Sequence, residues 1–134
     1  MLSKIAVATD GSDTAQRAVD AALDMAQRFG SELVVLTAYR ADGDAGGTWA
    51  SSSAVHAERV LAVAEEAAAE RGLACSSAML EGDPGEVVVE LAERHGADLV
   101  VVGSLGMHRR VLGSVPNTVT HRATCSVFVV KTDA

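Results

Sequence analysis

Residues 5–12 read IAVATDGS, an apolar run that ends abruptly in an acidic, glycine-containing turn. Such a run is typical of a buried strand, and the turn predicts where that strand ends. Beyond the turn, apolar residues recur at helical spacing as far as Phe29, with Ser12 suited to the N-cap and Gly30 to the helix stop. The first unit that we predict is therefore a strand followed by a helix.

The same alternation continues along the whole chain. Further apolar runs predict four more strands, at residues 33–39, 73–80, 99–102 and 127–130. Periodicity and capping residues predict three more helices, at residues 55–71, 84–95 and 114–122. Alternating strands and helices form parallel β-α-β units, and fully apolar strands fit a sheet that is covered on both faces. We therefore predict an α/β fold with a five-stranded, doubly wound parallel sheet of order 3-2-1-4-5 and four helices, in one domain over residues 1–134.

Composition and charge exclude several classes of protein. The 134 residues are 49% hydrophobic and 22% charged, as in ordinary globular proteins. Only 3% are aromatic and the net charge is -7, which disfavours nucleic acid and anionic membranes as partners. No apolar run approaches the ~20 residues of a membrane span. The acidic Asp10 lies too close to the N-terminus for the apolar core of a signal peptide to precede it. We expect a cytoplasmic protein that binds neither nucleic acid nor membrane.

A glycine-rich segment follows the fourth predicted strand. Residues 103–117 read GSLGMHRRVLGSVPN, and no acidic residue occurs between Leu99 and Thr132. A helix N-terminus at Gly113-Ser114 offers free N–H groups and positive partial charge, which favour phosphate. In the predicted strand order this segment lies beside the end of the first strand, where doubly wound sheets bind ligands. The alternative is that the glycines only form turns and that Ser114 only caps the helix.

Several of these stretches together resemble the universal stress protein family, over essentially the whole chain. They are IAVATDGS at residues 5–12, GDP at 82–84, ADLVVVG at 97–103 and GSV at 113–115. The resemblance implies an adenine-nucleotide-hydrolase-like α/β fold and, in nucleotide-binding members, the motif G-x2-G-x9-G-[ST]. Gly103, Gly106 and Gly113-Ser114 fit that motif, but six residues instead of nine separate Gly106 from Gly113.

The resemblance also implies how each part of an adenine nucleotide is held. Asp10 faces the ribose, and Ala38 offers backbone groups to the adenine. A carboxylate suits a ribose diol, although Asp10 could instead be only a turn residue before the first helix. The remaining implied contacts are Ala8, Thr9, Val102, Gly103 and Gly106 around the nucleotide, and Gly113, Ser114 and Val115 at the phosphates.

The shortened glycine segment contains Arg109 and Arg110. Because a guanidinium can grip phosphate oxygens bidentately, we expect these arginines to replace the backbone donors that the missing residues would supply. In the alternative interpretation both arginines point into solvent and the phosphate site is lost.

The expected function is regulation in the stress response by a protein that binds ATP or another adenine nucleotide, with or without Mg. Two alternatives stay open: a slow ATP hydrolase, for which the sequence shows no dedicated general base, and a dimeric interaction scaffold without nucleotide. We assign no catalytic residue and no metal ligand.

The fifth predicted strand indicates how the protein assembles. Val127–Val130 are apolar on both alternating faces, and an uncovered edge of that kind is prone to aggregate. Pairing with a second copy across a two-fold axis would cover it, and the family resemblance also implies a homodimer. Cys75 and Cys125 lie near opposite edges of the predicted sheet, so we expect two separate, buried thiols.

Overall fold

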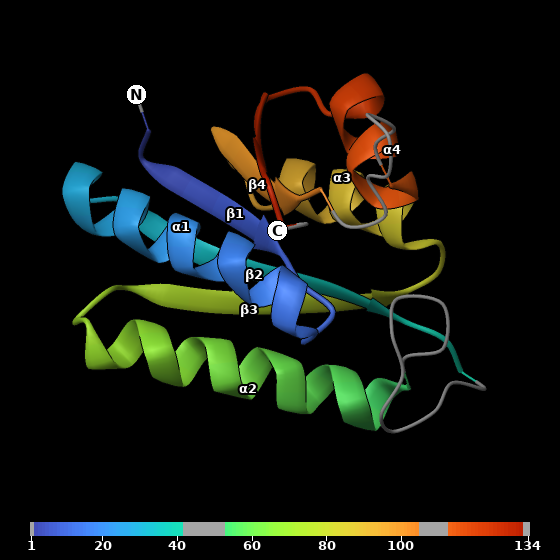
Figure 1. Ribbon diagram of the computed structural model, residues 1–134, viewed down its shortest axis with the longest axis horizontal. Helices are drawn as coiled ribbons and strands as arrows, with labels where there is room; N and C mark the ends of the chain where they lie inside the picture. Colours follow the sequence, from blue (N-terminus) through green and yellow to red (C-terminus); the bar gives the residue numbers. More distant parts are fainter. Residues whose placement is uncertain (1, 42–52, 105–112, 133–134) are drawn as a thin grey trace.

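The computed structural model describes residues 2–41, 53–104 and 113–132. Their order confirms the predicted fold: five parallel strands arranged β3-β2-β1-β4-β5, with four helices between them (Figure 1). The elements are β1 (Lys4–Ala8), α1 (Asp13–Phe29), β2 (Glu32–Tyr39), α2 (Ala54–Glu70), β3 (Cys75–Glu81), α3 (Pro84–Arg94), β4 (Leu99–Gly103), α4 (Ser114–Arg122) and β5 (Ser126–Val130).

The helices cover the two faces of the sheet in pairs. Ile5 and Val7 of β1 pack in a core cluster with residues of α1 and α2. Ala6 and Ala8, which point to the opposite face, pack in a second cluster with residues of α3 and α4. Because successive strand residues point to opposite faces, both sets must be apolar, and this explains the continuous apolar runs of the central strands.

The carboxyl ends of β1 and β4 lie side by side at one edge of the sheet. β1 lies between β2 and β4, and its last pairs are Ala8 with Leu36 and Val7 with Val101. The helix after β1 goes to one face and the helix after β4 to the other. The ends of β1 and β4 therefore flank the crevice where the direction of winding reverses.

The helix N-termini differ in how they are capped. The side chains of Ser12, Ser53 and Asp83 accept hydrogen bonds from the first turns of α1, α2 and α3, respectively. Gly113 precedes α4 and provides no side-chain cap. An uncapped helix N-terminus leaves backbone N–H groups available to another acceptor.

The two cysteines lie at the two edge strands: Cys75 begins β3, and Cys125 directly precedes β5. Cys75 and Cys125 are free, which agrees with their expected separation. The expectation that both are buried is wrong: each is partly exposed, because an edge strand is covered less completely than a central one. Partial burial and the nearby Glu65 carboxylate raise the pKa of Cys75 to about 11, and burial also raises the pKa of Cys125.

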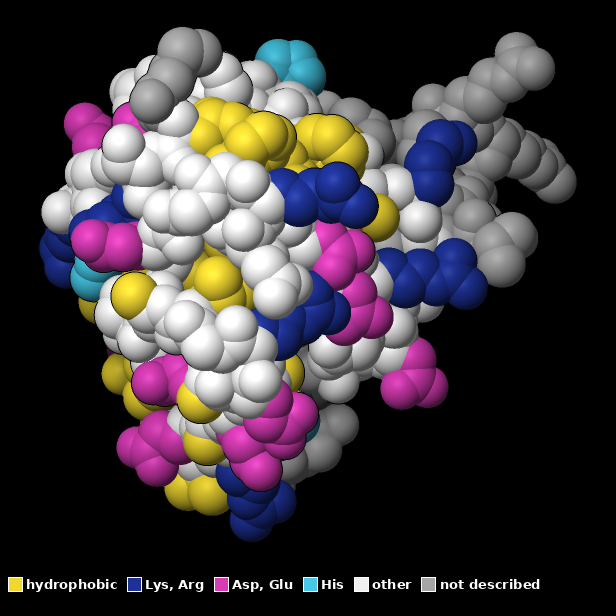
Figure 2. Space-filling model, turned by 90° about the vertical axis from the view of Figure 1, so that its left-hand side faces the viewer, with side chains coloured by type: hydrophobic (Ala, Val, Ile, Leu, Met, Phe, Trp, Pro, Cys, Tyr) yellow, Lys and Arg dark blue, Asp and Glu magenta, His cyan; other side chains and the backbone are white. Residues whose placement is uncertain are grey.

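The surface of the described residues carries charges of both signs. On the face drawn in Figure 2, acidic and basic side chains are interspersed with small groups of apolar side chains. In the described part of the chain, no helix has the length and apolar character needed to cross a bilayer.

Candidate functional site

Asp10 lies just beyond the carboxyl end of β1 and is only 1% exposed. Its Oδ1 accepts a hydrogen bond of 3.0 Å from the backbone N–H of Ser12. Its other carboxylate oxygen, Oδ2, is buried and has no hydrogen-bond partner in the described part of the chain. Because a buried polar atom without a partner is costly, Oδ2 is well suited to accept a hydrogen bond from a ligand.

Small apolar side chains lie on one side of this carboxylate edge. Ala8, Ala38, Val102 and Val115 belong to the same buried cluster, on the face that α3 and α4 cover. They come from β1, β2, β4 and α4, four elements far apart in the sequence. Four of the residues assigned from the sequence are therefore brought together.

Ala38 occupies a special position in the sheet ladder. It pairs with Leu80 of β3, whereas the pairing between β1 and β2 ends two residues earlier, at Leu36. Leu36 accepts from the Thr9 N–H, so by strand alternation the N–H and C=O of Ala38 point in the same direction, past the end of β1. A flat heterocycle at this edge could hydrogen-bond both groups.

Thr9 and Gly11 form the other side of the β1–α1 turn. Thr9 Oγ1 accepts from the Gly11 N–H at 3.0 Å, and the Thr9 side chain lines a cavity between α1 and α2. The side chain of Thr9 therefore lies away from the small apolar group around Ala8. Gly11 has φ of +82°, and a Cβ there would approach Val60 Cγ2 to 2.6 Å, so only glycine fits.

Gly103, at the end of β4, is explained by packing. It pairs with Val130 of β5, and a Cβ would approach Thr132 Cγ2 to 2.9 Å. Neither Gly103 nor Gly113 has a positive φ. The close approach of the segment after β5 requires a small residue at position 103.

Among the described residues, no side chain caps the N-terminus of α4. Gly113 is the N-cap and Ser114 the first helical residue, so the alternative that Ser114 caps the helix is wrong. Pro116 has no N–H, and Asn117 donates to the Gly113 carbonyl. The N–H groups of Ser114 and Val115 therefore stand at the positive end of the helix dipole, where anions are favoured.

Sequence reasoning missed one residue of this edge. His56, on α2, places Nε2 3.3 Å from the backbone oxygen of Asp10. This contact joins residues 46 positions apart, and no motif signals it. Three of the residues assigned from the sequence, Gly106, Arg109 and Arg110, lie outside the described residues. Within the described ranges, no three His, Cys, Asp or Glu side chains gather closely enough to hold a metal ion.

Known proteins resemble this chain over nearly its full length. The model of the universal stress protein family matches residues 1–131. Universal stress proteins of Methanocaldococcus jannaschii and Thermus aquaticus are 33% and 35% identical to it; the alignments cover 98% of this chain and 83% and 100% of the relatives, respectively. A solved universal stress protein in complex with cAMP shares 30% identity and a TM-score of 0.80, with 98% of each chain covered.

Proposed function

Because the chain belongs to the universal stress protein family, we propose that it is a regulatory protein that binds an adenine nucleotide. Residues 1–134 then form one nucleotide-binding domain. The observation that carries the proposal is the unpartnered Oδ2 of the buried Asp10, beside the small-residue cluster and the uncapped N-terminus of α4. The related protein that binds cAMP supports the same ligand class.

The ribose is the part of the ligand that Asp10 recognises. Oδ1 is already occupied by the Ser12 N–H, so the turn holds the carboxylate in place before any ligand arrives. Oδ2 then accepts a hydrogen bond from a ribose hydroxyl. The adenine lies against Ala8, Ala38 and Val102, where small side chains leave room for a flat ring.

The phosphates lie at the other end of the site. They accept hydrogen bonds from the N–H groups of Ser114 and Val115 and from the exposed Ser114 hydroxyl. Gly103 and Gly113 lie beside this path. Gly106 and the cationic Arg109 and Arg110 belong to the segment that connects β4 to α4, and our proposal gives the arginines the role of the three motif residues that are missing. ATP is the proposed ligand, and a bound Mg ion would neutralise part of its charge.

The first test compares the parent protein with Asp10→Asn by calorimetry, using AMP, ADP, ATP and cAMP. Asparagine keeps an oxygen for the Ser12 N–H but presents an amide donor in place of Oδ2. We expect affinity to fall about tenfold to hundredfold, because a hydrogen bond to a charged group contributes about 1.5–3 kcal/mol.

The matched control is Asp13→Asn, an equal loss of charge at an exposed residue in the first turn of α1. Its affinity should stay within about twofold of the parent, since exposed charges act weakly at a distance. If the parent binds none of the four nucleotides, the proposal is wrong and the interaction-scaffold hypothesis replaces it.

The role of the arginines has its own test. The Arg109→Ala/Arg110→Ala double variant should lose affinity for ATP more than for AMP, and added salt should weaken binding in the parent more than in the variant. Equal ATP affinity in both proteins would show that the arginines do not compensate for the short segment.

We also propose that the protein is a homodimer joined through β5. β5 is an edge strand, and Phe128 on it is 46% exposed. Pairing of Val127–Val130 with the same strand of a second copy would cover the edge. Sedimentation should show a dimer at micromolar concentration, and Phe128→Asp should shift it toward monomer.

Phe29→Asp is the control for this surface, because Phe29 is also exposed, at 57%, but lies on α1. It should leave the dimer intact. A parent protein that sediments as a monomer at micromolar concentration contradicts the proposed dimer.

A further inference from the structure

A cavity of about 340 Å³ lies between α1 and α2, on the opposite face of the sheet from the proposed nucleotide site. Val19 and Ala64, which line it, belong to the core cluster of the α1/α2 face. Ala8 and Val115, at the nucleotide site, belong to the cluster of the α3/α4 face. The two sites therefore lie mostly on opposite faces of the sheet and share the β1–α1 turn, from which Thr9 and Gly11 line the cavity.

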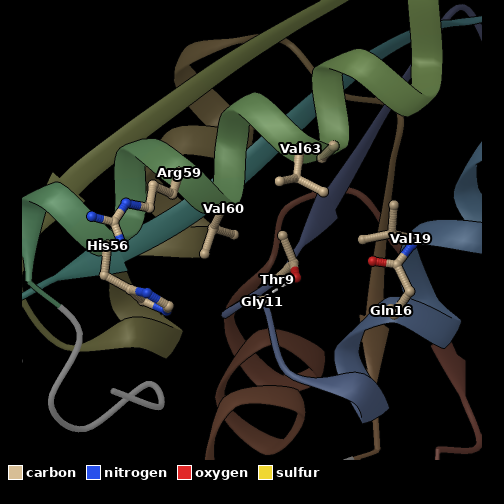
Figure 3. Close-up of a pocket in the computed structure, with 9 residues that line it drawn as sticks. Thr9, Gly11, Gln16, Val19, His56, Arg59, Val60 and Val63 are labelled. Atoms are coloured by element: carbon tan, nitrogen blue, oxygen red, sulfur yellow. Dashed lines mark hydrogen bonds between the residues drawn. The ribbon is translucent and has the colours of Figure 1, made fainter. Parts of the chain in front are cut away.

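The lining of this cavity has an apolar side and a cationic end. Figure 3 shows Val60 and Val63 of α2 facing Val19 of α1 across the groove, with His56 and Arg59 together at one end. The described lining residues include no carboxylate, in a protein whose net charge is -7. Such a combination favours a ligand with an aliphatic body and an anionic head.

Two lining residues are available to such a ligand. Val63 is 63% exposed, an unusual position for a large apolar side chain next to a cavity. Arg59 forms no ion pair in the part of the chain that the structure describes, whereas Arg71, the C-cap residue of the same helix, pairs with Asp24. Arg59 thus keeps all its donors for a carboxylate, which a guanidinium can bind bidentately.

The length of the groove limits the size of the ligand. His56 and Val63 are two helical turns apart on α2, about 11 Å along the helix axis. This length is comparable to that of an extended medium-chain fatty acid, and the cavity volume is at the lower end of the range for small-molecule sites. On these grounds we propose that the cleft between α1 and α2 binds a medium-chain aliphatic carboxylate, with its head at the end formed by His56 and Arg59 and its chain along Val60 and Val63.

The floor of this site is the β1–α1 turn itself. Gly11 packs against Val60, and His56 Nε2 lies 3.3 Å from the backbone oxygen of Asp10. Gln16, which lines the cavity, donates its amide to Asp20 Oδ1 at 3.0 Å, and Asp20 is not among the lining residues. A carboxylate ligand therefore meets the Arg59 cation without a competing acid among the lining residues.

The test uses octanoate as the probe, with binding measured by calorimetry and by methyl chemical shifts. Octanoate should bind the parent and shift the methyl signals of Val19, Val60 and Val63. The variant Val63→Asp removes an apolar wall and adds a like charge, so octanoate binding should weaken at least about tenfold. Val63 is exposed, so this variant should fold, as its thermal melting will show.

The control for Val63→Asp is Val55→Asp, also on α2 and 56% exposed but outside the cavity lining. It should leave octanoate binding within about twofold of the parent. If octanoate does not bind the parent at millimolar concentration, or if both variants weaken binding equally, the proposed site is wrong.

A second pair of variants tests the orientation of the ligand. Arg59→Gln should weaken octanoate about threefold to fivefold, the size expected for an exposed ion pair, and should leave binding of the neutral analogue 1-octanol unchanged. Arg17→Gln, an equal loss of charge at an exposed residue of α1 outside the cavity lining, should change neither. Equal effects of Arg59→Gln on octanoate and octanol would contradict the proposed head-group contact.

Discussion

The N-termini of α1 and α4 lie at the same edge of the sheet, but their backbone donors have different fates. At α1, the Ser12 side chain accepts from the Ala15 N–H and Asp10 Oδ1 accepts from the Ser12 N–H. At α4, the N-cap Gly113 has no side chain, and among the described residues no side chain caps the first N–H groups. The chain thus caps the α1 terminus with the Ser12 side chain, beside a carboxylate held by the same turn, and the described residues place no side-chain cap on α4. This difference suits ribose recognition at the first terminus and phosphate recognition at the second.

The largest expected effect comes from closing the open terminus with a charge. Gly113→Asp places a carboxylate at the N-cap of α4, where it can accept from the first turn and repel phosphate. Its backbone, with φ of -63° and ψ of 168°, suits aspartate at this position. We expect ADP affinity to fall on the order of 100-fold, while the free energy of unfolding stays equal or rises by a few tenths of a kcal/mol.

Gly113→Asn separates the effect of the helix cap from the effect of the negative charge, because asparagine caps a helix about as well as aspartate but is neutral. It should lower ADP affinity much less than aspartate does, and adenosine, which has no phosphate, should bind all three proteins alike. If adenosine binding falls in parallel with ADP binding, Gly113→Asp acts through the structure of the site and not through the phosphate.

An intermediate effect is expected at the N-terminus of α1, which the Ser12 side chain caps. Ser12→Ala removes the cap of α1 and should lower the free energy of unfolding by about 1 kcal/mol, with ADP affinity within about twofold of the parent. Ser114→Ala should do the reverse, with little loss of stability and a several-fold loss of ADP affinity, because Ser114 is exposed and does not cap. Chemical denaturation measures the free energy of unfolding of both variants, and calorimetry measures their ADP affinity. Equal losses of stability and of affinity in the two variants would contradict the expected contrast.

The smallest effect is expected from a neutral hydroxyl cap. Gly113→Ser should raise the free energy of unfolding by only a few tenths of a kcal/mol, since glycine is itself a tolerated N-cap. Denaturant unfolding curves of parent and variant, fitted with the same m-value, would resolve this change in the free energy of unfolding. A gain comparable to the loss at Ser12→Ala would mean that α4 is strained without a ligand.

The sequence predicted the strands and two of the four helix N-caps, Ser12 and Asp83, because these features follow from local patterns. Apolar runs, the Ser12 and Asp83 caps and the Gly30 stop are each decided within a few residues. The predicted order 3-2-1-4-5 is confirmed, but alternation of strands and helices alone does not fix an order; this order makes the polar, glycine-bearing ends of β1 and β4 neighbours. Four of the assigned residues, Ala8, Ala38, Val102 and Val115, consequently come together as expected.

What the sequence could not show depends on packing between distant elements. The contact of His56 with Asp10 and the fit of Gly11 against Val60 exist only because α2 lies over the β1–α1 turn. The sequence predicts either a nucleotide contact or a turn at Gly103, but neither interpretation reveals its immediate neighbour, Thr132, beyond β5. The partial exposure of Cys75 likewise reflects an edge position that residue type does not reveal.

The most direct test of the two-terminus account is an NMR titration of isotope-labelled protein with ADP, and then with adenosine, following the backbone amides of both helix N-termini. We expect ADP to produce large shifts at the Ser114 and Val115 amides and small ones at Thr14 and Ala15, and adenosine to leave Ser114 and Val115 nearly unchanged. Shifts of similar size at α1 and α4, or shifts at Ser114 and Val115 that adenosine reproduces, would contradict it.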